Sequence, residues 1–347
     1  MTYFRKHIHE MSGYKPGEQL LGTNVIKLNT NENPYPPSPA ALEILHHFSG
    51  ELLRRYPDPR GRQFRQVVSQ TFDVPTDWIL VGNGSDDLLT ILNRACVASD
   101  RAVVYPTPTY VLYRTLAQIQ DAAVVEIPYD EDYNLPVEQL IAADGALTLI
   151  ASPNSPSGTA IPLELLDKLA SQLSGVLVID EAYVDFAEAN ALELAQKYNN
   201  VIILRTLSKG YSLAGLRLGF AIANPSLLAG LIKVKDSYNV DAIAYAVGAA
   251  AVADQAYKIA NAEKVKDSRS QLANAFKQLG FRVWPSQTNF LLVQPPSSNA
   301  KHLYEALKAQ NILVRYFKQP RLEDKLRITV GTQEQNQTLI QTLSSLL

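Results

Sequence analysis

The chain has 347 residues, 46% of them hydrophobic and 19% charged, which is enough for about two domains with a large apolar core. Its 32 basic and 34 acidic residues give a formal net charge of −2, which excludes an overall positive field for nucleic acid or anionic membranes. Cys96 is the only cysteine, which excludes an intramolecular disulfide and fits a reducing compartment.

The N-terminal run MTYFRKHIHEM lacks the apolar core of a signal peptide. The longest apolar run, at residues 242–253, is shorter than the roughly 20 residues that a membrane-spanning helix needs. The five histidines have no spacing typical of a metal site. We therefore expect a soluble, cytoplasmic protein that has no metal and no membrane or nucleic acid as partner.

Seven short apolar runs predict strands, at residues 78–82, 102–106, 123–127, 147–152, 176–180, 201–206 and 218–223. Most are continuously apolar, which is typical of strands buried on both faces. Helical patterns at 135–144, 162–173 and 190–198 separate several of them. We predict an α/β fold with a mostly parallel seven-stranded sheet between helices. The last strand follows its predecessor closely enough to run in the opposite direction.

An Ala-rich region from about residue 225 to 279 predicts helices in more than one piece. Three strand-like runs then follow a short FRVWP segment (281–285): NFLLVQ (289–294), ILVRYF (312–317) and LRITVG (326–331), with a helix near 301–310. This pattern predicts a smaller α+β domain. We expect a large domain at 34–245, and a smaller unit formed by the N-terminal segment 1–33 together with 246–347.

Polar clusters follow the predicted strands at their carboxyl ends. The runs GNGSDD (82–87), PTPTY (106–110) and SPNSPSG (152–158) each follow one strand directly. Carboxyl ends of parallel strands meet at one edge of a sheet, where open α/β sheets bind ligands. This edge is expected to collect Ser85, Asp86, Tyr110, Asn154, Asp180, Tyr183, Ser208 and Lys209.

The predicted edge has the groups that pyridoxal 5′-phosphate requires. Lys209 supplies an amine for the aldehyde, Asp180 a carboxylate that keeps the ring nitrogen protonated, and Tyr110 a flat face for stacking. A lone lysine in a loop is usually only solvated, so the accompanying groups carry the prediction. For the phosphate they are the backbone N–H groups of Ser85 and Asp86, the hydroxyls of Thr206 and Ser208, and Arg217.

Three runs, DEAY (180–183), TLSK (206–209) and GLRLG (215–219), resemble those of the fold-type I, class I/II aminotransferases, and the resemblance spans nearly the whole chain. Four further runs resemble the branch of this family that acts on histidinol phosphate, with glutamate as amino donor. They are LNTNENPYPPSP (28–39), RYPDPRG (55–61), GNGSDDLL (82–89) and LRITVGT (326–332). The resemblance implies a pyridoxal-phosphate-dependent transaminase of histidine biosynthesis.

The resemblance also implies individual roles. Lys209 would hold the cofactor covalently and move the substrate proton, Asp180 would pair with the ring nitrogen, and Tyr183 would donate to the ring's phenolic oxygen. Tyr110 would stack on the ring. Tyr56 would reach the cofactor phosphate of the partner subunit, so a homodimer with shared active sites is expected.

One run departs from the family pattern. The family often has Asn-Asn-Pro-Thr-Gly, whose second Asn bonds the ring oxygen, whereas residues 154–158 read NSPSG. Asn154 or Ser155 could take this role, or Tyr183 could act alone. The run could also be only a rigid turn.

Substrate selection is expected in the smaller unit and the N-terminal segment. Arg315 and Arg327 are the candidate anion-binding residues. One Arg suffices for a carboxylate, while a dianionic phosphate favours more than one, so Arg315 could add a second guanidinium for a phosphate. Arg315 could instead be a solvated strand residue. The resemblance adds Tyr14, Asn31, Glu32 and Asn289 on the imidazole side of the substrate, although Tyr14 could simply pack as an aromatic residue.

Some features of the sequence are also compatible with other functions. An aromatic amino-acid aminotransferase or a phosphothreonine-type decarboxylase would use similar residues. An ATPase is suggested by VLVIDEA (176–182), which looks like a Walker B strand, but the sequence contains no Gly-Lys pair for the phosphate-binding loop. A dinucleotide site is disfavoured because GNGSDD lacks the third glycine of its motif.

Overall fold

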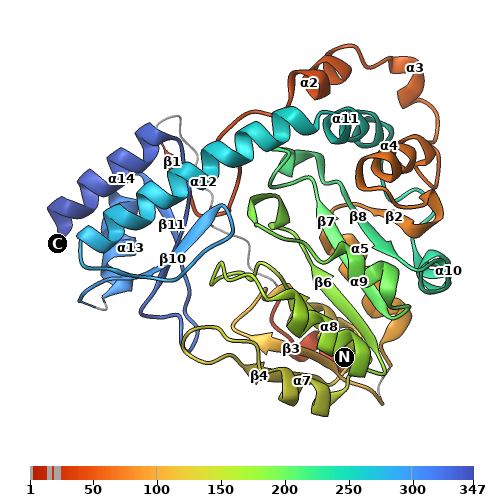
Figure 1. The fold of residues 1–347 in the computed structure, drawn as a ribbon, viewed down its shortest axis with the longest axis horizontal. Coiled ribbons are helices and arrows are strands. Elements are labelled where there is room, and N and C mark those ends of the chain that lie inside the picture. The colour runs from red at the N-terminus through yellow and green to blue at the C-terminus, as the bar shows by residue number, and fades with distance from the viewer. Residues whose placement is uncertain (1–2, 14–17, 19–24, 99, 298) are drawn as a thin grey trace.

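The seven predicted strands form one large sheet (Figure 1). Their order in the sheet is β2-β8-β7-β6-β5-β3-β4. They are β2 (Ile79–Gly82), β3 (Val103–Thr107), β4 (Val124–Pro128), β5 (Leu147–Ala151), β6 (Val176–Asp180), β7 (Val201–Thr206) and β8 (Gly219–Ala223). The computed structural model, which describes residues 3–13, 18, 25–98, 100–297 and 299–347, shows β8 antiparallel to both of its neighbours and the other pairs parallel. The predicted mostly parallel sheet with a reversed last strand is therefore confirmed.

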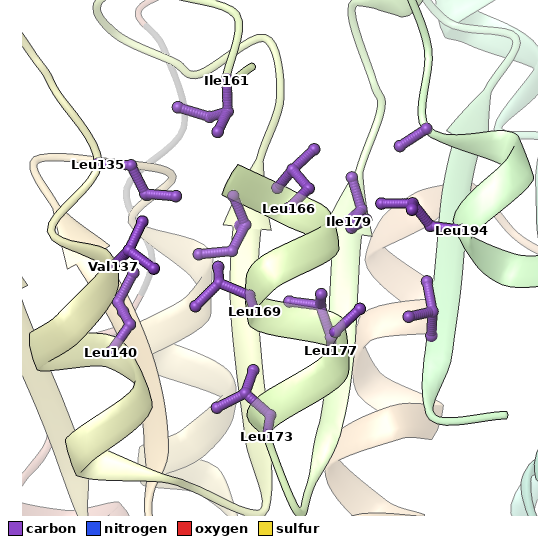
Figure 2. Packing of buried hydrophobic residues seen from close by; sticks show 14 of the residues in the cluster. Leu135, Val137, Leu140, Ile161, Leu166, Leu169, Leu173, Leu177, Ile179 and Leu194 are labelled. Atoms are coloured by element: carbon purple, nitrogen blue, oxygen red, sulfur yellow. The ribbon is translucent and has the colours of Figure 1, made fainter. Parts of the chain in front are cut away.

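Helices cover both faces of this sheet. They include α2 (Pro39–His46), α4 (Arg62–Phe72), α5 (Ser85–Cys96), α6 (Leu112–Ile119), α7 (Val137–Ala143), α8 (Leu163–Gln172), α9 (Leu192–Lys197), α10 (Pro225–Val234) and α11 (Ala242–Ala253). In β6, Leu177 and Ile179 pack with α7, α8 and α9, while Val178 packs on the opposite face with α5 and α6. This two-sided burial is the physical reason for the continuously apolar strands. Figure 2 shows the side chains of the α8 face.

The second sheet is smaller, with the order β1-β11-β12-β10-β9. Its strands are β1 (Ile26–Leu28), β9 (Arg282–Val283), β10 (Phe290–Gln294), β11 (Ile312–Tyr316) and β12 (Leu326–Thr329), and its helices are α12 (Gln255–Gln278), α13 (Ala300–Ala309) and α14 (Gln333–Leu346). The predicted α+β unit is present, and β1 joins it by pairing in parallel with β11.

The N-terminal segment contacts both units. While β1 belongs to the small sheet, the short helix α1 (Lys6–Glu10) lies against α6 of the large unit, where Arg5 donates a 3.2 Å hydrogen bond to the carbonyl of Ile119. The predicted domain boundary at residue 245 falls within α11, which packs against α2 and α4. From there α12 runs to the small sheet (Figure 1). The division into residue ranges stays a prediction.

A buried ion pair joins the ends of β6 and β7, next to the polar edge. Arg205 Nη2 lies 2.8 Å from Glu181 Oε2, and the two side chains are only 10% and 2% exposed. Arg205→Met should lower the free energy of unfolding by about 3–5 kcal/mol, because it leaves a buried carboxylate unpaired. Chemical denaturation would measure this change.

The matched control is Arg94→Met, which removes an exposed pair with Asp236. That change should cost no more than about 1 kcal/mol. Equal effects of the two substitutions would contradict a structural role for the Glu181–Arg205 pair.

Candidate active site

A cleft of about 240 Å³ lies at the carboxyl edge of the large sheet and is lined on its other side by Arg315 and Arg327 of the small sheet. The sequence-predicted residues that line it are Asn31, Ser85, Asp86, Tyr110, Asp180, Tyr183, Thr206, Ser208, Lys209, Arg217, Arg315 and Arg327. Strand direction explains the convergence. The parallel strands β2, β3, β5, β6 and β7 end at this edge, and the antiparallel β8 begins there, just after Arg217.

One side of the cleft is built around the start of α5. A Cβ atom on Gly84 would lie 2.8 Å from Arg217 Nη2, and one on Gly219 would lie 2.9 Å from the backbone nitrogen of Ser85. Glycine at position 84 therefore leaves room for Arg217, and glycine at position 219 allows the start of β8 to lie close to the helix N-terminus. The Thr206 hydroxyl completes this side by donating to Ser208 Oγ at 2.9 Å.

Asp86 ties two of these groups together. Its carboxylate accepts hydrogen bonds from Arg217 Nη2 at 3.0 Å and from the Tyr110 hydroxyl at 3.1 Å. Helix-end N–H groups, hydroxyls and a guanidinium are the donors that bind a phosphate group. This side of the cleft therefore fits the phosphate of pyridoxal phosphate.

Asp180 lies at the end of β6 and is only 5% exposed. Tyr113 donates to its Oδ2 at 2.8 Å, and the backbone N–H of Ala182 donates to its Oδ1 at 3.2 Å. Burial raises the pKa of Asp180 to about 6, while these two hydrogen bonds act in the opposite direction. A buried carboxylate in this position fits a cationic ring nitrogen.

Lys209 follows β7 and extends into the cleft, where its Nζ donates to the carbonyl of Thr30 at 3.1 Å. Burial lowers the pKa of Lys209 to about 8, and the positive charges of Arg327 and Arg217 add to this effect. The amine is therefore neutral more often than an ordinary lysine near neutral pH, as a nucleophile or a general base requires.

Tyr183 faces the same cleft from the loop after β6. Its hydroxyl accepts a 2.8 Å hydrogen bond from Asn31 Nδ2, and burial raises its pKa above the ordinary value. Arg327 Nη1 donates to Ser155 Oγ at 3.0 Å, and Ser155 also bonds the Tyr183 side chain. Asn31, Ser155 and Arg327 thus surround the Tyr183 hydroxyl.

Arg315 and Arg327 are direct cross-strand neighbours on β11 and β12. Both guanidinium groups lie near the ring of Phe317, at 5.3 and 5.6 Å from its centre. Like charges directly opposite each other in a sheet are destabilising. An anionic ligand in the cleft would offset the repulsion between these two positive charges.

Asn154, which is predicted to contact the cofactor, is not among the residues that line the cleft. Its side chain is fully buried beside the cleft, where it accepts from the Thr109 hydroxyl at 2.7 Å and donates to Ser157 Oγ and to the carbonyl of Pro108. Ser155, the alternative at this position, lines the cleft instead.

Three other predicted residues, Glu32, Asn289 and Tyr56, lie away from the described cleft lining. Glu32 forms an ion pair with Lys27, and Asn289 is buried and donates to the backbone carbonyl of Asn31 at 2.9 Å. Tyr56 is 80% exposed and stacks on Tyr238, so it does not reach the cleft of its own chain. Tyr14 lies outside the described residues.

Tyr113 and Phe317 contribute to the site but were not singled out in the sequence. Tyr113 holds Asp180, and Phe317 supports the two arginines. The Tyr-x-x-Tyr spacing of Tyr110 and Tyr113 and the Phe that ends the ILVRYF run were the available signals. Neither pattern is specific, because aromatic residues at such positions usually only pack in the core.

Among the described residues, no group of three or more His, Cys, Asp or Glu side chains is placed to bind a metal ion. No helix in the described parts of the chain is both long and apolar enough to cross a membrane.

The chain is similar to known proteins over nearly its whole length. The family described as aminotransferase class I and II matches residues 23–343. The chain is 64% identical over 347 residues to histidinol-phosphate aminotransferase 1 of Trichormus variabilis, covering 100% of this chain and 99% of that protein. It is 43% identical to histidinol-phosphate aminotransferase of Citrifermentans bemidjiense, with the same coverage. The crystal structure of the Sinorhizobium meliloti histidinol-phosphate aminotransferase in complex with pyridoxal-5′-phosphate has a TM-score of 0.90 at 25% identity, covering 100% of this chain and 99% of that one.

Proposed function

The chain belongs to the class I and II aminotransferase family, and we therefore propose that it is a pyridoxal-phosphate-dependent transaminase of histidine biosynthesis. It interconverts L-histidinol phosphate and 2-oxoglutarate with imidazole acetol phosphate and glutamate. The observation that carries this proposal is the convergence of Lys209, Asp180 and two adjacent arginines on one cleft. The predicted cytoplasmic location is part of the same proposal.

The bound cofactor would supply an aldehyde that links to amines and a ring that takes up negative charge. Asp180 would hold the proton on the ring nitrogen, and the start of α5 with Arg217 would bind the phosphate. Nζ of Lys209 would accept the proton from the substrate's α-carbon and return it at the cofactor side. Tyr183, which Asn31 orients, would donate its hydroxyl proton to the ring oxygen.

Arg315 and Arg327 would bind the anionic ends of the two substrates. Arg327 would bind the α-carboxylate of glutamate in one half-reaction and the phosphate of histidinol phosphate in the other. A second guanidinium strengthens the binding of a dianionic phosphate more than the binding of a carboxylate. Arg315 is therefore the residue that favours the phosphorylated substrate.

We predict that Arg315→Gln raises KM for histidinol phosphate by about 10- to 100-fold, the equivalent of one charge-assisted hydrogen bond. KM for glutamate should rise much less. Steady-state kinetics with each substrate varied in turn would measure both constants. Arg321→Gln is the control, because this exposed arginine bonds the carbonyls of Thr107 and Asp130 rather than lining the cleft. An equal rise for both substrates would contradict the assignment.

Two related reactions are distinguished by direct assay. An aromatic amino-acid aminotransferase would turn over phenylalanine best, and a phosphothreonine-type decarboxylase would release carbon dioxide from phosphothreonine. The two relatives reported above support histidinol phosphate as the preferred substrate. We expect kcat/KM to be highest for histidinol phosphate. Faster turnover of phenylalanine, or decarboxylation of phosphothreonine, would overturn the proposal.

The proposed enzyme is a homodimer. The segment around Tyr56 exposes Leu52 and Leu53 by 52% and 58%, and Tyr238 beside it by 48%. Such an apolar patch favours association with a second copy, where Tyr56 would reach the partner's cofactor phosphate.

Sedimentation should give the mass of a dimer, and Leu53→Glu should shift it toward the monomer with loss of activity. Val125→Glu, at an exposed site on the edge strand β4, is the control and should leave the dimer intact. A fully active monomer of the unaltered protein would contradict the shared site.

A further inference from the structure

The carboxylate of Asp180 is held at both oxygens. Oδ1 accepts from the backbone N–H of Ala182 at 3.2 Å, which the chain provides whatever the side chains are. Oδ2 accepts from the hydroxyl of Tyr113 at 2.8 Å, a side chain 67 positions earlier in the sequence. The hydrogen bond to Oδ2 therefore depends on the side chain of a single residue, Tyr113.

The side chain of Tyr113 is buried and held between two other aromatic rings. It lies on α6 with no exposed surface, and its ring meets the ring of Tyr105 at 5.8 Å and that of Tyr110 at 5.7 Å, the latter at an interplanar angle of 86°. Burial and the nearby charge of Asp180 hold the pKa of Tyr113 well above its usual range. The hydroxyl therefore keeps its proton and acts as a donor to the carboxylate.

We propose that Tyr113 is a positioning residue, whose hydroxyl fixes the orientation of the Asp180 carboxylate for binding the ring nitrogen of the cofactor. The inference rests on the proposed function and deepens it. It assigns to Tyr113 a task that its ring alone could not perform, because only the hydroxyl reaches Asp180.

The surroundings of Asp180 explain why this bond matters. Burial and the carboxylates of Asp86 and Glu181 all disfavour its ionised form, and the neutral hydroxyl of Tyr183 also lies within electrostatic range. The donors that oppose them are Tyr113 and the N–H of Ala182. Removing one of two donors from a buried carboxylate must make protonation easier.

The test compares Tyr113→Phe with the wild type and with Tyr105→Phe. Tyr105 is a neighbour that is only 2% exposed and whose hydroxyl donates to Glu126, away from the cleft, so it controls for the loss of a tyrosine hydroxyl. Each protein is freed of cofactor, and the dissociation constant of added pyridoxal phosphate is measured between about pH 4.5 and 8.5, a range that brackets the titration of the Asp180 carboxyl, whose pKa is about 6. Thermal unfolding of each variant confirms that it is folded.

In Tyr113→Phe, the pH below which affinity falls should move upward by about one unit, the equivalent of one hydrogen bond. In Tyr105→Phe it should stay at the wild-type value. The cofactor phosphate and the amine of Lys209 also titrate in this range, but equally in all three proteins, so the difference between the variants reports on Asp180.

An equal shift in both variants, a uniform loss of affinity without a shift, or no change in Tyr113→Phe would overturn this inference. A wild-type protein that does not bind pyridoxal phosphate at all would instead overturn the proposed function. The two failures are therefore distinguishable.

Discussion

Lys209→Ala is expected to lower kcat for transamination by about 10⁴-fold, because it removes both the amine that holds the cofactor and the base that moves the substrate proton. The residual protein should still bind pyridoxal phosphate weakly, since Asp180, Arg217 and the start of α5 are unchanged. Single-turnover and steady-state assays with glutamate and histidinol phosphate would measure the loss.

Lys168→Ala is the matched control, because this lysine lies on the surface of α8 and pairs with Glu138. Its kcat should equal that of the wild type. A Lys209→Ala enzyme that retains more than about a tenth of wild-type activity would contradict the role of this amine, since loss of a general acid–base group costs roughly 100-fold at least.

Asp180→Asn should lower kcat by about 10³-fold, because a neutral amide cannot stabilise the positive charge on the ring nitrogen at the moment when the ring takes up electrons. The same change should stabilise the cofactor-free protein near neutral pH. Burial raises the pKa of Asp180 from 3.8 to about 6, so the ionised carboxylate disfavours the folded state by up to about 3 kcal/mol.

The pH dependence of this stability gain can also be measured. A carboxyl whose pKa is raised on folding weakens the fold as pH rises from about 4 to about 6, and the full penalty applies above that range. The stability gain of Asp180→Asn should therefore be largest near pH 7 and shrink as the pH falls toward 4. Asp167→Asn, at the surface, should show no such gain. A gain that does not vary with pH would contradict the assignment to Asp180.

The large sheet could be predicted because burial on both faces leaves a direct trace in the sequence. Val178 packs on one face of β6 and Leu177 and Ile179 on the other, so the whole run must be apolar. The place of the site followed from strand direction, because each polar cluster comes directly after a strand that ends at the same edge. Lys209 and Asp180 line the cleft for this reason.

The directions of individual side chains could not be predicted in the same way. Asn154 and Ser155 are neighbours in the loop after β5, yet the Asn154 side chain is buried and hydrogen-bonds Thr109, Ser157 and the carbonyl of Pro108, while Ser155 lines the cleft. Asn289 is buried and donates to the backbone carbonyl of Asn31, so its contact with the substrate stays a prediction. Tyr113 escaped notice because its bond to Asp180 joins elements that are far apart in the sequence.

The most direct test of the central claim is to treat the purified protein with borohydride and map the labelled peptide by mass spectrometry. Reduction should fix pyridoxal phosphate to the chain at Lys209 alone, with loss of the yellow colour of the bound cofactor. If the cofactor is not incorporated, or if it is fixed at a different lysine, the account of this cleft is wrong.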